Sequence, residues 1–542
     1  MPGFKIALFG GVAPRLAPRL LKDSQAQVAT NAYLKDGDLR AWTGSTLIAT
    51  PTKTSPISIY RFGQDITDES EYWFNWTDDT DVARGAIAGD TSERTYFTNA
   101  AGAPQVTDNS IALGADYPDA SYILGIPKPA AAPSVALTGT GSGATEYRAY
   151  VYTYVSGWGE EGPPSDASSP IGWQSGNAVT VSGMSTGPSG SYNITSKNIY
   201  RVVTTDNGAQ YEYVDSVTLA TTSYSDSIAD TALGSTLPST GWIAPPTDML
   251  GIIAMANGMA AGFSVSENAI CFAEPYRWHA WPSAYRLAVN YKPVALGSFG
   301  TTLVCATKGF AYLAQGVDPS SMVQDRIEDA TLAIVSKRSM ASVRGFGAVW
   351  ATPSGLVAVS PAGPLTLLDQ LFTRKQWELL VPSSITAGSY DGRYFGFYDD
   401  GTVQQGFILD PNDPLGTFTY TDQYATACFT DPLRDAMYLV QSGKINRWDN
   451  GGSNLSYTWK SKVFVPTRPI NPTCAQVEAA SFPVTFKLYA DGTLVKTQTV
   501  TSNDPFRLPT GYKGREFEVE ITGTSEVKAV YVAESIEALK AV

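Results

Sequence analysis

The chain of 542 residues contains little histidine, cysteine or charge. Its one histidine is His279, and its four cysteines are Cys271, Cys305, Cys428 and Cys474, with no two close enough in sequence to form a CxxC pair. This composition argues against a histidine-rich metal centre and against a cysteine-based zinc site. We expect the cysteines to be buried free thiols in a reducing compartment.

A long apolar run and an excess of basic residues are also missing. No stretch reaches the ~18 apolar residues of a membrane-spanning helix, and residues 1–20 have no apolar core long enough for a signal peptide. We therefore expect a protein made in a cytoplasm, with no membrane span and no export signal. Lys and Arg total 38 against 51 Asp and Glu, a formal charge of −13. This balance argues against a sequence-specific DNA reader, although DNA can slide past an acidic wall.

Aromatic and turn-forming residues are plentiful. There are 29 Tyr, 21 Phe and 12 Trp, together with 49 Gly and 34 Pro, while charged residues make up only 16%. Many aromatics, many turn residues and little charge are typical of short strands joined by turns. The composition predicts an all-β protein, and its length suggests about three or four domains at ~100–200 residues each.

Residues 1–125 are expected to form an N-terminal extended arm and the first propeller strands. The prolines near the start favour an extended segment, and an Asp-Gly turn at 36–37 predicts a hairpin between residues 26–34 and 39–42. The alternating or aromatic runs at 57–62, 72–76 and 94–98 are each bounded by turn residues, which predicts short antiparallel strands.

The remaining chain divides into three expected parts. Residues 126–246 lie between proline-rich linkers and have the size of an inserted fibronectin-like β-sandwich, with a long alternating strand at 147–155. Residues 247–460 repeat a strand–turn–strand unit about every 45 residues, which is typical of β-propeller blades. Residues 461–542 are expected to form a C-terminal small β-sandwich. The predicted fold is a degenerate β-propeller platform that carries these two sandwiches.

Motifs that would carry chemistry are weak. No P-loop, GxGxxG, GxSxG or HExxH motif is present. The acidic pairs that could act as in a glycosidase are Glu160 with Glu161, Glu267 with Glu274, and Asp399 with Asp400. The aspartates that could bind calcium are Asp36 with Asp38, and Asp78 and Asp79 with Asp81. We expect these to be turn or edge carboxylates, and we expect the aromatic segment 276–282 around His279 to pack on the propeller. We therefore assign no catalytic residue, no metal site and no cofactor.

Three segments carry a resemblance to a known family. They are Gly11-Val12-Ala13-Pro14-Arg15-Leu16 continuing through Ala26–Ala32 to Gly37–Ala41; Leu124-Gly125-Ile126-Pro127-Lys128-Pro129 leading to Tyr147–Val155 and Gly159–Ser165; and Tyr457-Thr458-Trp459-Lys460-Ser461-Lys462. In these segments the chain resembles the tail nozzle proteins of short-tailed double-stranded-DNA phages, the group of packaged-DNA stabilisation proteins and tail tubular protein B.

The resemblance implies a structural virion protein without catalytic residues, assembled in the host cytoplasm. It implies a homo-oligomer, a hexameric ring below the portal and adaptor, that extends the channel for genomic DNA and helps to retain the packaged genome. Tail fibres, spikes or a plug would be further partners. Six copies would carry a formal charge of about −78, and an acidic lumen wall would repel phosphate.

Two other functions are compatible with the same composition. One is a receptor-binding or baseplate protein of a virion, although the chain has no heptads and no fibre-like repeats. The other is a carbohydrate-binding or glycoside-hydrolysing propeller. That enzyme would need two carboxylates in a funnel lined by aromatics such as Trp278 and Trp281.

Overall fold

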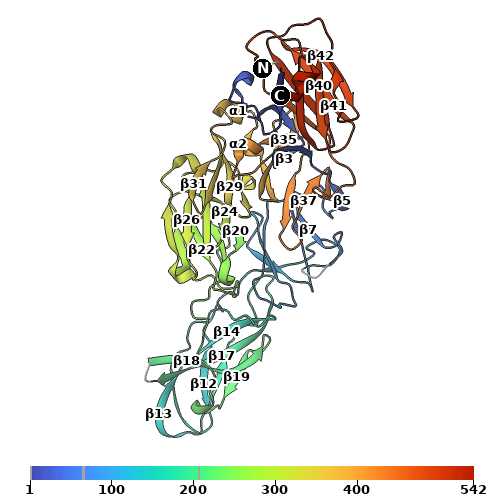
Figure 1. Cartoon of the computed structure of the whole chain (residues 1–542). Helices are drawn as coiled ribbons and strands as arrows, with labels where there is room; N and C mark the ends of the chain where they lie inside the picture. The colour runs from blue at the N-terminus through green and yellow to red at the C-terminus, as the bar shows by residue number, and fades with distance from the viewer. Residues whose placement is uncertain (1–2, 64–66, 206–207, 542) are drawn as a thin grey trace.

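The computed structural model describes residues 3–63, 67–205 and 208–541, and strands make up most of its regular structure. Three bodies follow one another along the molecule in Figure 1: a β-sandwich that holds both chain ends, a β-propeller, and an inserted β domain at the far end. The all-β class and the propeller platform predicted from the sequence are confirmed. No described helix has the length and apolarity needed to cross a bilayer.

The propeller consists of seven sheets within the described residues. They are β6 (Ser58–Arg61) with β7 (Trp73–Trp76); β8 (Asp81–Arg84), β9 (Thr95–Thr98), β10 (Gln105–Thr107) and β11 (Tyr122–Ile123); β20 (Met249–Ala254), β21 (Ala260–Ser264), β22 (Ala269–Phe272) and β23 (Arg286–Ala288); β24 (Pro293–Phe299), β25 (Thr302–Thr307), β26 (Tyr312–Gln315) and β27 (Val323–Arg326); β28 (Ala341–Val343), β29 (Gly347–Thr352), β30 (Gly355–Ser360) and β31 (Gly363–Thr366); β32 (Thr386–Tyr390), β33 (Arg393–Asp399), β34 (Gln404–Leu409) and β35 (Thr419–Thr421); and β36 (Ala427–Asp431), β37 (Ala436–Gln441) and β38 (Lys444–Arg447) with β5 (Thr46–Ala49).

The sheets form a ring because their innermost strands contact one another in succession. Strand β8 contacts β20, and contacts then run through β24, β28, β32 and β36 to β6. Middle strands such as β29 and β30 are buried along their whole length, since each lies between two neighbouring blades. The N-terminal strand β5 pairs with β38 and so completes the last blade with chain from the other end of the sequence.

The described residues of the inserted domain form eight strands. They are β12 (Ser134–Thr138), β13 (Ser142–Arg148), β14 (Tyr150–Ser156), β15 (Ile171–Ser175), β16 (Ala178–Ser182), β17 (Ile194–Thr205), β18 (Gly208–Thr218) and β19 (Ser223–Asp226). The sheets β12-β16-β19 and β14-β17-β18 enclose a core to which Tyr150, Tyr152 and Tyr154 contribute. The predicted single strand at 147–155 divides at Ala149, because β13 pairs with β15 whereas β14 pairs with β17. The alternation of side chains along 147–155 was predicted correctly. It did not reveal the division, because the alternating pattern continues where the chain passes from one sheet to the other.

The second sandwich draws strands from both ends of the chain. They are β1 (Gly3–Ile6), β2 (Ala26–Thr30), β3 (Ala32–Lys35), β4 (Asp38–Ala41), β39 (Tyr457–Ser461), β40 (Cys474–Ala479), β41 (Val484–Ala490), β42 (Thr493–Val500), β43 (Phe506–Arg507), β44 (Phe517–Gly523) and β45 (Val527–Ala533). One sheet has the order β3-β4-β45-β40-β43, with β1 on β45, and the other continues from the propeller blade through β35-β2-β39-β44-β41-β42. Three short α-helices lie outside these sheets in the described residues: α1 (Arg374–Glu378), α2 (Pro414–Thr417) and α3 (Ile536–Ala541).

The N-terminal hairpin is shorter than predicted. Strands β3 and β4 form it, with positive φ angles at Asp36 and Gly37 in the turn. Residues 26–30 form the separate strand β2, because Asn31 has a φ of 54° and breaks the extended chain. The Asn31 side chain is buried and accepts a hydrogen bond from the Thr421 hydroxyl at 2.9 Å, which holds this bend in place.

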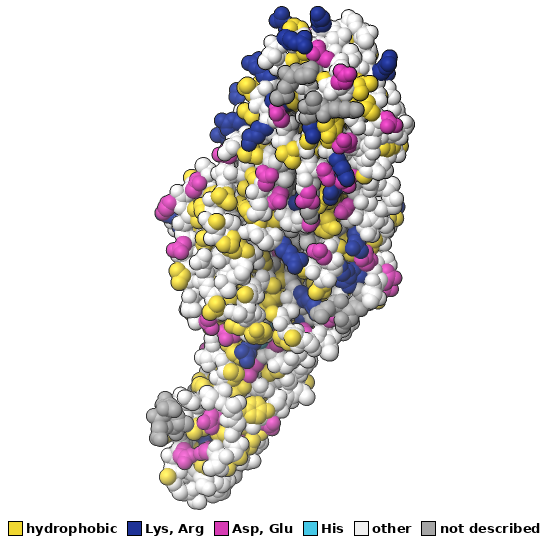
Figure 2. All heavy atoms as spheres, viewed as in Figure 1, with side chains coloured by type: hydrophobic (Ala, Val, Ile, Leu, Met, Phe, Trp, Pro, Cys, Tyr) yellow, Lys and Arg dark blue, Asp and Glu magenta, His cyan; other side chains and the backbone are white. Residues whose placement is uncertain are grey.

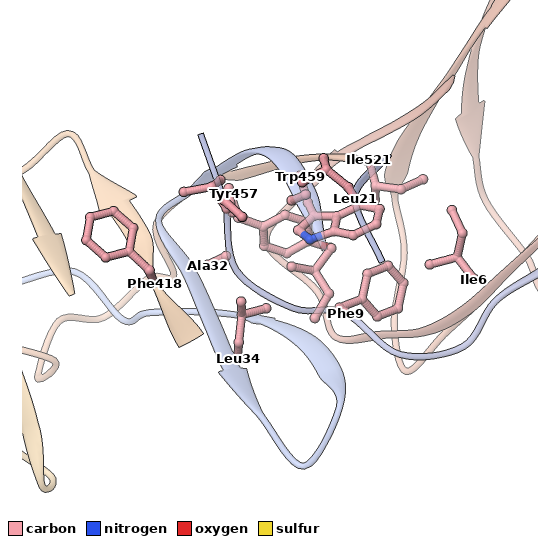
Figure 3. Packing of buried hydrophobic residues seen from close by; sticks show 14 of the residues in the cluster. Ile6, Phe9, Leu21, Ala32, Leu34, Phe418, Tyr457, Trp459 and Ile521 are labelled. Carbon is pink, nitrogen blue, oxygen red and sulfur yellow. The ribbon is translucent and has the colours of Figure 1, made fainter. Parts of the chain in front are cut away.

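One apolar core joins the propeller to the sandwich (Figure 3). Phe9 packs edge-on against Trp459 with ring centroids 4.9 Å apart, and the Trp459 indole N–H donates to the Gly10 carbonyl at 3.0 Å. A Cβ on Gly11 would lie 2.5 Å from the Phe418 carbonyl oxygen, so only glycine fits there. The two adjacent glycines therefore allow the N-terminal chain to pass between the blade and the sandwich.

Candidate functional site

The centre of the propeller is hollow at the carboxyl ends of its innermost strands. One hollow of about 1000 Å³ lies between the ends of β24, β28, β32 and β36. A second, of about 370 Å³, lies between β6, β8, β20 and β36. Both are lined by Asp431 and Pro432, so they open side by side at the same mouth. Their volumes fall in the range of ordinary ligand sites.

This mouth carries charges of both signs. Arg434 pairs with Asp431 at 2.8 Å, and the exposed Arg344 lies 3.5 Å from Asp435. In the smaller hollow, Arg84 and the Tyr60 ring share the wall, and burial raises the pKa of Tyr60 to about 12. The Tyr60 hydroxyl therefore stays protonated at neutral pH. Charge-paired arginines and a neutral phenol therefore lie at a mouth whose remaining lining is mostly apolar.

The opposite mouth is closed by an ion-pair cluster. Lys337 lies 3.0 Å from Asp79 and 2.8 Å from Asp81, beside a hollow of about 200 Å³. Burial raises the pKa of Asp81 despite the attraction of Lys337, and burial alone would lower the pKa of Lys337, but the two carboxylates raise it. The adjacent Arg338 donates to the main-chain oxygens of Ile57 and Thr426. These contacts fasten the segment after β27 across the amino ends of β6, β8 and β36.

The aspartates considered as calcium ligands have other partners. Asp79 and Asp81 pair with Lys337, and Asp38 lies 3.3 Å from Arg40. Asp36 occupies the hairpin turn. Within the described ranges, no group of three or more His, Cys, Asp or Glu side chains is arranged to hold a metal ion.

The candidate carboxylate pairs do not meet in the propeller hollow. Glu267 pairs with Arg286 at 2.6 Å, and Glu274 accepts a hydrogen bond from Tyr285 at 3.0 Å, both outside the mouth. Asp399 and Asp400 instead accept main-chain N–H groups in the turn after β33.

The two tryptophans proposed for a sugar-binding funnel are buried. Trp278 donates its indole N–H to the Gly258 carbonyl at 2.8 Å, and Trp281 donates to the Trp278 carbonyl at 2.7 Å. Both belong to the core between the blade of β8 and the blade of β20. The expectation that the segment 276–282 packs on the propeller agrees with this placement, whereas a funnel lined by these two residues does not.

A buried charged joint fastens the inserted domain to the propeller. Glu160 of the inserted domain accepts from Arg94 at 2.6 Å, and Arg94 also binds Asp90 at 2.7 Å. His279 lies against the same joint, with Nε2 3.1 Å from the Glu161 carbonyl and Nδ1 3.6 Å from Glu160. These side chains come from the loop between β8 and β9, from the loop after β14 and from the loop after β22, three places far apart in the sequence.

Apolar and aromatic contacts surround this joint. The Trp158 indole N–H donates to Asp108 at 2.9 Å, and its ring packs edge-on against Tyr122. A Cβ on Gly125 would collide with the returning linker at Ala244 and Pro245, so the two linkers cross in contact. The inserted domain is therefore attached by two chain crossings and by a buried ion pair between them.

Sequence reasoning singled out Glu160 and His279 but missed Arg94, Lys337 and Arg338. Arg94 was seen only as the first residue of a strand, and nothing local marks its partner 66 residues away. The adjacent cations at 337–338 also gave no distinguishing signal, since Arg374 and Lys375 are adjacent in the same way.

Comparison with protein-family models finds no match, and comparison with curated sequences finds none. Among solved structures, virginiamycin B lyase from Staphylococcus aureus is 10% identical, covers 68% of this chain and 99% of its own, and has a TM-score of 0.27. The WD40 domain of SCAP from fission yeast is 9% identical, covers 67% and 84%, and has a TM-score of 0.24. Likeness at these scores carries no argument, and the propeller assignment rests on the order of the sheets.

Proposed function

We propose that this chain is the tail nozzle subunit of a short-tailed double-stranded-DNA phage. In this role it is a structural virion protein without catalytic activity. It forms a hexameric ring that extends the portal–adaptor channel, helps to retain packaged DNA, conducts the DNA during ejection and anchors tail fibres or spikes. The ring is assembled in the host cytoplasm and remains in the virion.

The observation that carries this proposal is where the three resembling segments lie in the fold. The first supplies β2, β3 and β4, and the third is β39, which pairs with β2 and β44 and makes the blade and the sandwich one continuous sheet. The second contains the crossing linker at Gly125 and the joint residue Glu160. The resemblance therefore covers the contacts that set the arrangement of all three bodies.

Charge and side-chain placement are consistent with this role. The candidate carboxylate pairs do not converge, as a glycosidase would require, and the chain carries a net charge of −13. An acidic lumen wall would limit adhesion of phosphate during DNA transit.

The proposal is tested by native mass measurement, with and without the adaptor ring of the same phage. We expect a closed ring near six times 57.9 kDa, formed alone or on the adaptor. A chain that stays monomeric and never joins the adaptor would overturn the proposal. A trimer that binds host cells but not the adaptor would favour a receptor-binding protein, and hydrolysis of glycans would favour the carbohydrate-active alternative.

A further inference from the structure

Charge is unevenly distributed along the molecule. Residues 1–45 and 456–542, which form the terminal sandwich and its approaches, hold 16 Lys and Arg against 12 Asp and Glu. Residues 46–455 hold 22 against 39. Figure 2 shows many dark-blue side chains at the end where α1 and both termini lie in Figure 1, and others spread over the propeller. In an acidic protein with one basic end, the basic end of one copy attracts the acidic surface of another copy.

The basic end patch consists of residues 14–23 and helix α1 with Leu379. The two segments lie together, because the Arg15 N–H donates to the Leu371 carbonyl at 2.8 Å and Gln376 donates to the Pro14 carbonyl at 2.8 Å. The patch holds five Lys and Arg against two Asp and Glu. Its exposed leucines are Leu16, Leu20 and Leu379, with exposed fractions of 40%, 63% and 72%.

Several cations of this patch are free to meet a partner. Arg374 pairs with Glu378 at 2.9 Å. Arg19, Lys22 and Lys375 are exposed and have no ion pair in the described part of the chain. Exposed leucines between unpaired cations form a surface of the kind that binds a protein partner, which would bury the apolar area and pair the charges.

The acidic rim patch consists of residues 317–329 at the outer edge of the blade β24–β27. It holds four carboxylates against the single cation Arg326, which binds Glu328. Val317 and Val323 are each 60% exposed. Strand β27 is the outermost strand of its sheet, so one edge of its backbone has no strand beside it in the described structure. Figure 2 shows magenta side chains along this rim, beside β26 of Figure 1.

We propose that the basic end patch of one copy docks on the acidic rim patch of a second copy of this chain. The two patches carry opposite net charges of equal size, three in each case by residue type, and each surrounds exposed aliphatic side chains. Opposite charges steer the encounter, and the leucines and valines supply apolar area at its centre. Because the patches are different surfaces of one molecule, the contact is heterologous, the type that builds rings or filaments.

A second copy fits the basic patch better than DNA does. A DNA-binding surface neutralises phosphates with cations and gains nothing from exposed leucines at its centre. An apolar centre with arginine around it is the anatomy of a protein interface. The contact goes beyond the nozzle proposal, which names no surface between copies, and it needs only two copies of the chain and no adaptor.

The test uses two charge-reversal variants of the full chain. Arg19→Glu with Lys22→Glu reverses the basic end patch, and Asp325→Lys with Glu328→Lys reverses the acidic rim patch. A matched control, Lys513→Glu with Arg515→Glu, makes the same charge change at exposed positions of the sandwich outside both patches. Self-association of each protein is measured by sedimentation velocity across a concentration series, at about 0.1 M and about 1 M salt, where the screening length falls from about 10 Å to about 3 Å.

We expect the wild type and the control to associate at low salt and to dissociate at high salt. Each reversed variant alone should associate about tenfold or more weakly, because like charges then face each other. An equal mixture of the two variants should regain association, since the reversed patches complement one another, and this recovery also shows that both variants are folded.

Three results would overturn the proposal: a wild type that is monomeric at low salt, a mixture that does not recover, or a control that loses association to the same extent. Random-sequence duplex DNA is the second probe. If it binds the wild type and the basic reversal abolishes that binding without altering self-association, the patch is a nucleic-acid site instead. A wild type that stays monomeric alone but forms a ring on the adaptor would overturn this contact and leave the nozzle proposal standing, so the two failures are distinguishable.

Discussion

Replacing Arg94 by methionine should release the inserted domain from the propeller. Methionine keeps much of the length of the arginine side chain but removes its charge and its donors. Arg94 is 8% exposed, and its partners Asp90 and Glu160 are 14% and 13% exposed. The variant therefore leaves two nearly buried carboxylates without their shared cation.

The expected cost follows from this burial. Removing one partner of a buried ion pair costs about 3–5 kcal/mol, because the remaining charge is desolvated and uncompensated. The joint can avoid that cost by opening and letting water reach Glu160. We therefore expect Arg94→Met to destabilise the closed joint by about 3 kcal/mol, while the sheets of the inserted domain remain folded.

The assay is limited proteolysis of the two linkers, at 126–134 and 238–246, combined with hydrogen exchange at the loop after β14. Both rates should rise in the variant, and small-angle scattering should show a broader distribution of shapes. Lys128→Met is the matched control, since Lys128 pairs with Asp166 near the same joint but both are largely exposed. That change should cost about 0–1 kcal/mol.

The same joint gives a pH dependence. Burial pushes the pKa of Asp90 upward, but the hydrogen bonds and charge of Arg94 and nearby main-chain N–H groups hold it below its ordinary value. A carboxyl with a lowered pKa in the folded state stabilises that state above its unfolded pKa of about 4, and loses the effect as the pH falls further. The contact between Asp90 and Arg94 within the propeller should therefore weaken below about pH 4 in the wild type. Unchanged proteolysis in Arg94→Met, or equal effects in Lys128→Met, would refute the reasoning.

Three further changes test the fold. In a urea titration, Gly11→Ala should lower the free energy of unfolding by about 1–3 kcal/mol, because its Cβ collides with the main chain. The control Gly452→Ala has open space around it, so its free energy of unfolding should stay within about 0.5 kcal/mol of the wild type. Asp226→Asn removes the buried carboxylate from the Arg201 guanidinium and leaves only the partly exposed Asp230 as its counter-charge, so the inserted domain should lose about 3 kcal/mol, read from hydrogen exchange in β14 and β17. Burial raises the pKa of the Cys305 and Cys428 thiols to about 12; native protein at about pH 8 should thus react slowly with a disulfide reagent, and rates equal to those of the unfolded chain would contradict this.

Local patterns predicted the local structure well. The tyrosines at 150, 152 and 154 alternate, and they point into the core of the inserted domain as expected. The Asp36-Gly37 turn joins β3 and β4, as the Asp-Gly pair predicted. In each case the signal and the structure lie within a few residues of one another, because turn geometry and strand alternation are properties of neighbouring residues.

Long-range pairing had no such signal. Nothing in residues 26–30 indicates that β2 pairs with β39, about 430 residues later, since any strand edge of suitable pattern is an equal partner from sequence alone. Trp278 and Trp281 were expected to pack on the propeller, but the sequence did not indicate their partners, which are the core between two blades and nearby main-chain oxygens. The tertiary fold creates both sets of contacts, so no local pattern in the sequence predicts them.

Strand β5 also affects how the chain matures on the ribosome. Its partner β38 is translated about 400 residues later, which at about 5–20 residues per second is a delay on the order of tens of seconds. Throughout that interval the last blade cannot form, so the ring of blades stays open. A chain that terminates early in translation therefore keeps strand β5 without its partner β38 and open to proteases, so blade closure distinguishes finished subunits from fragments.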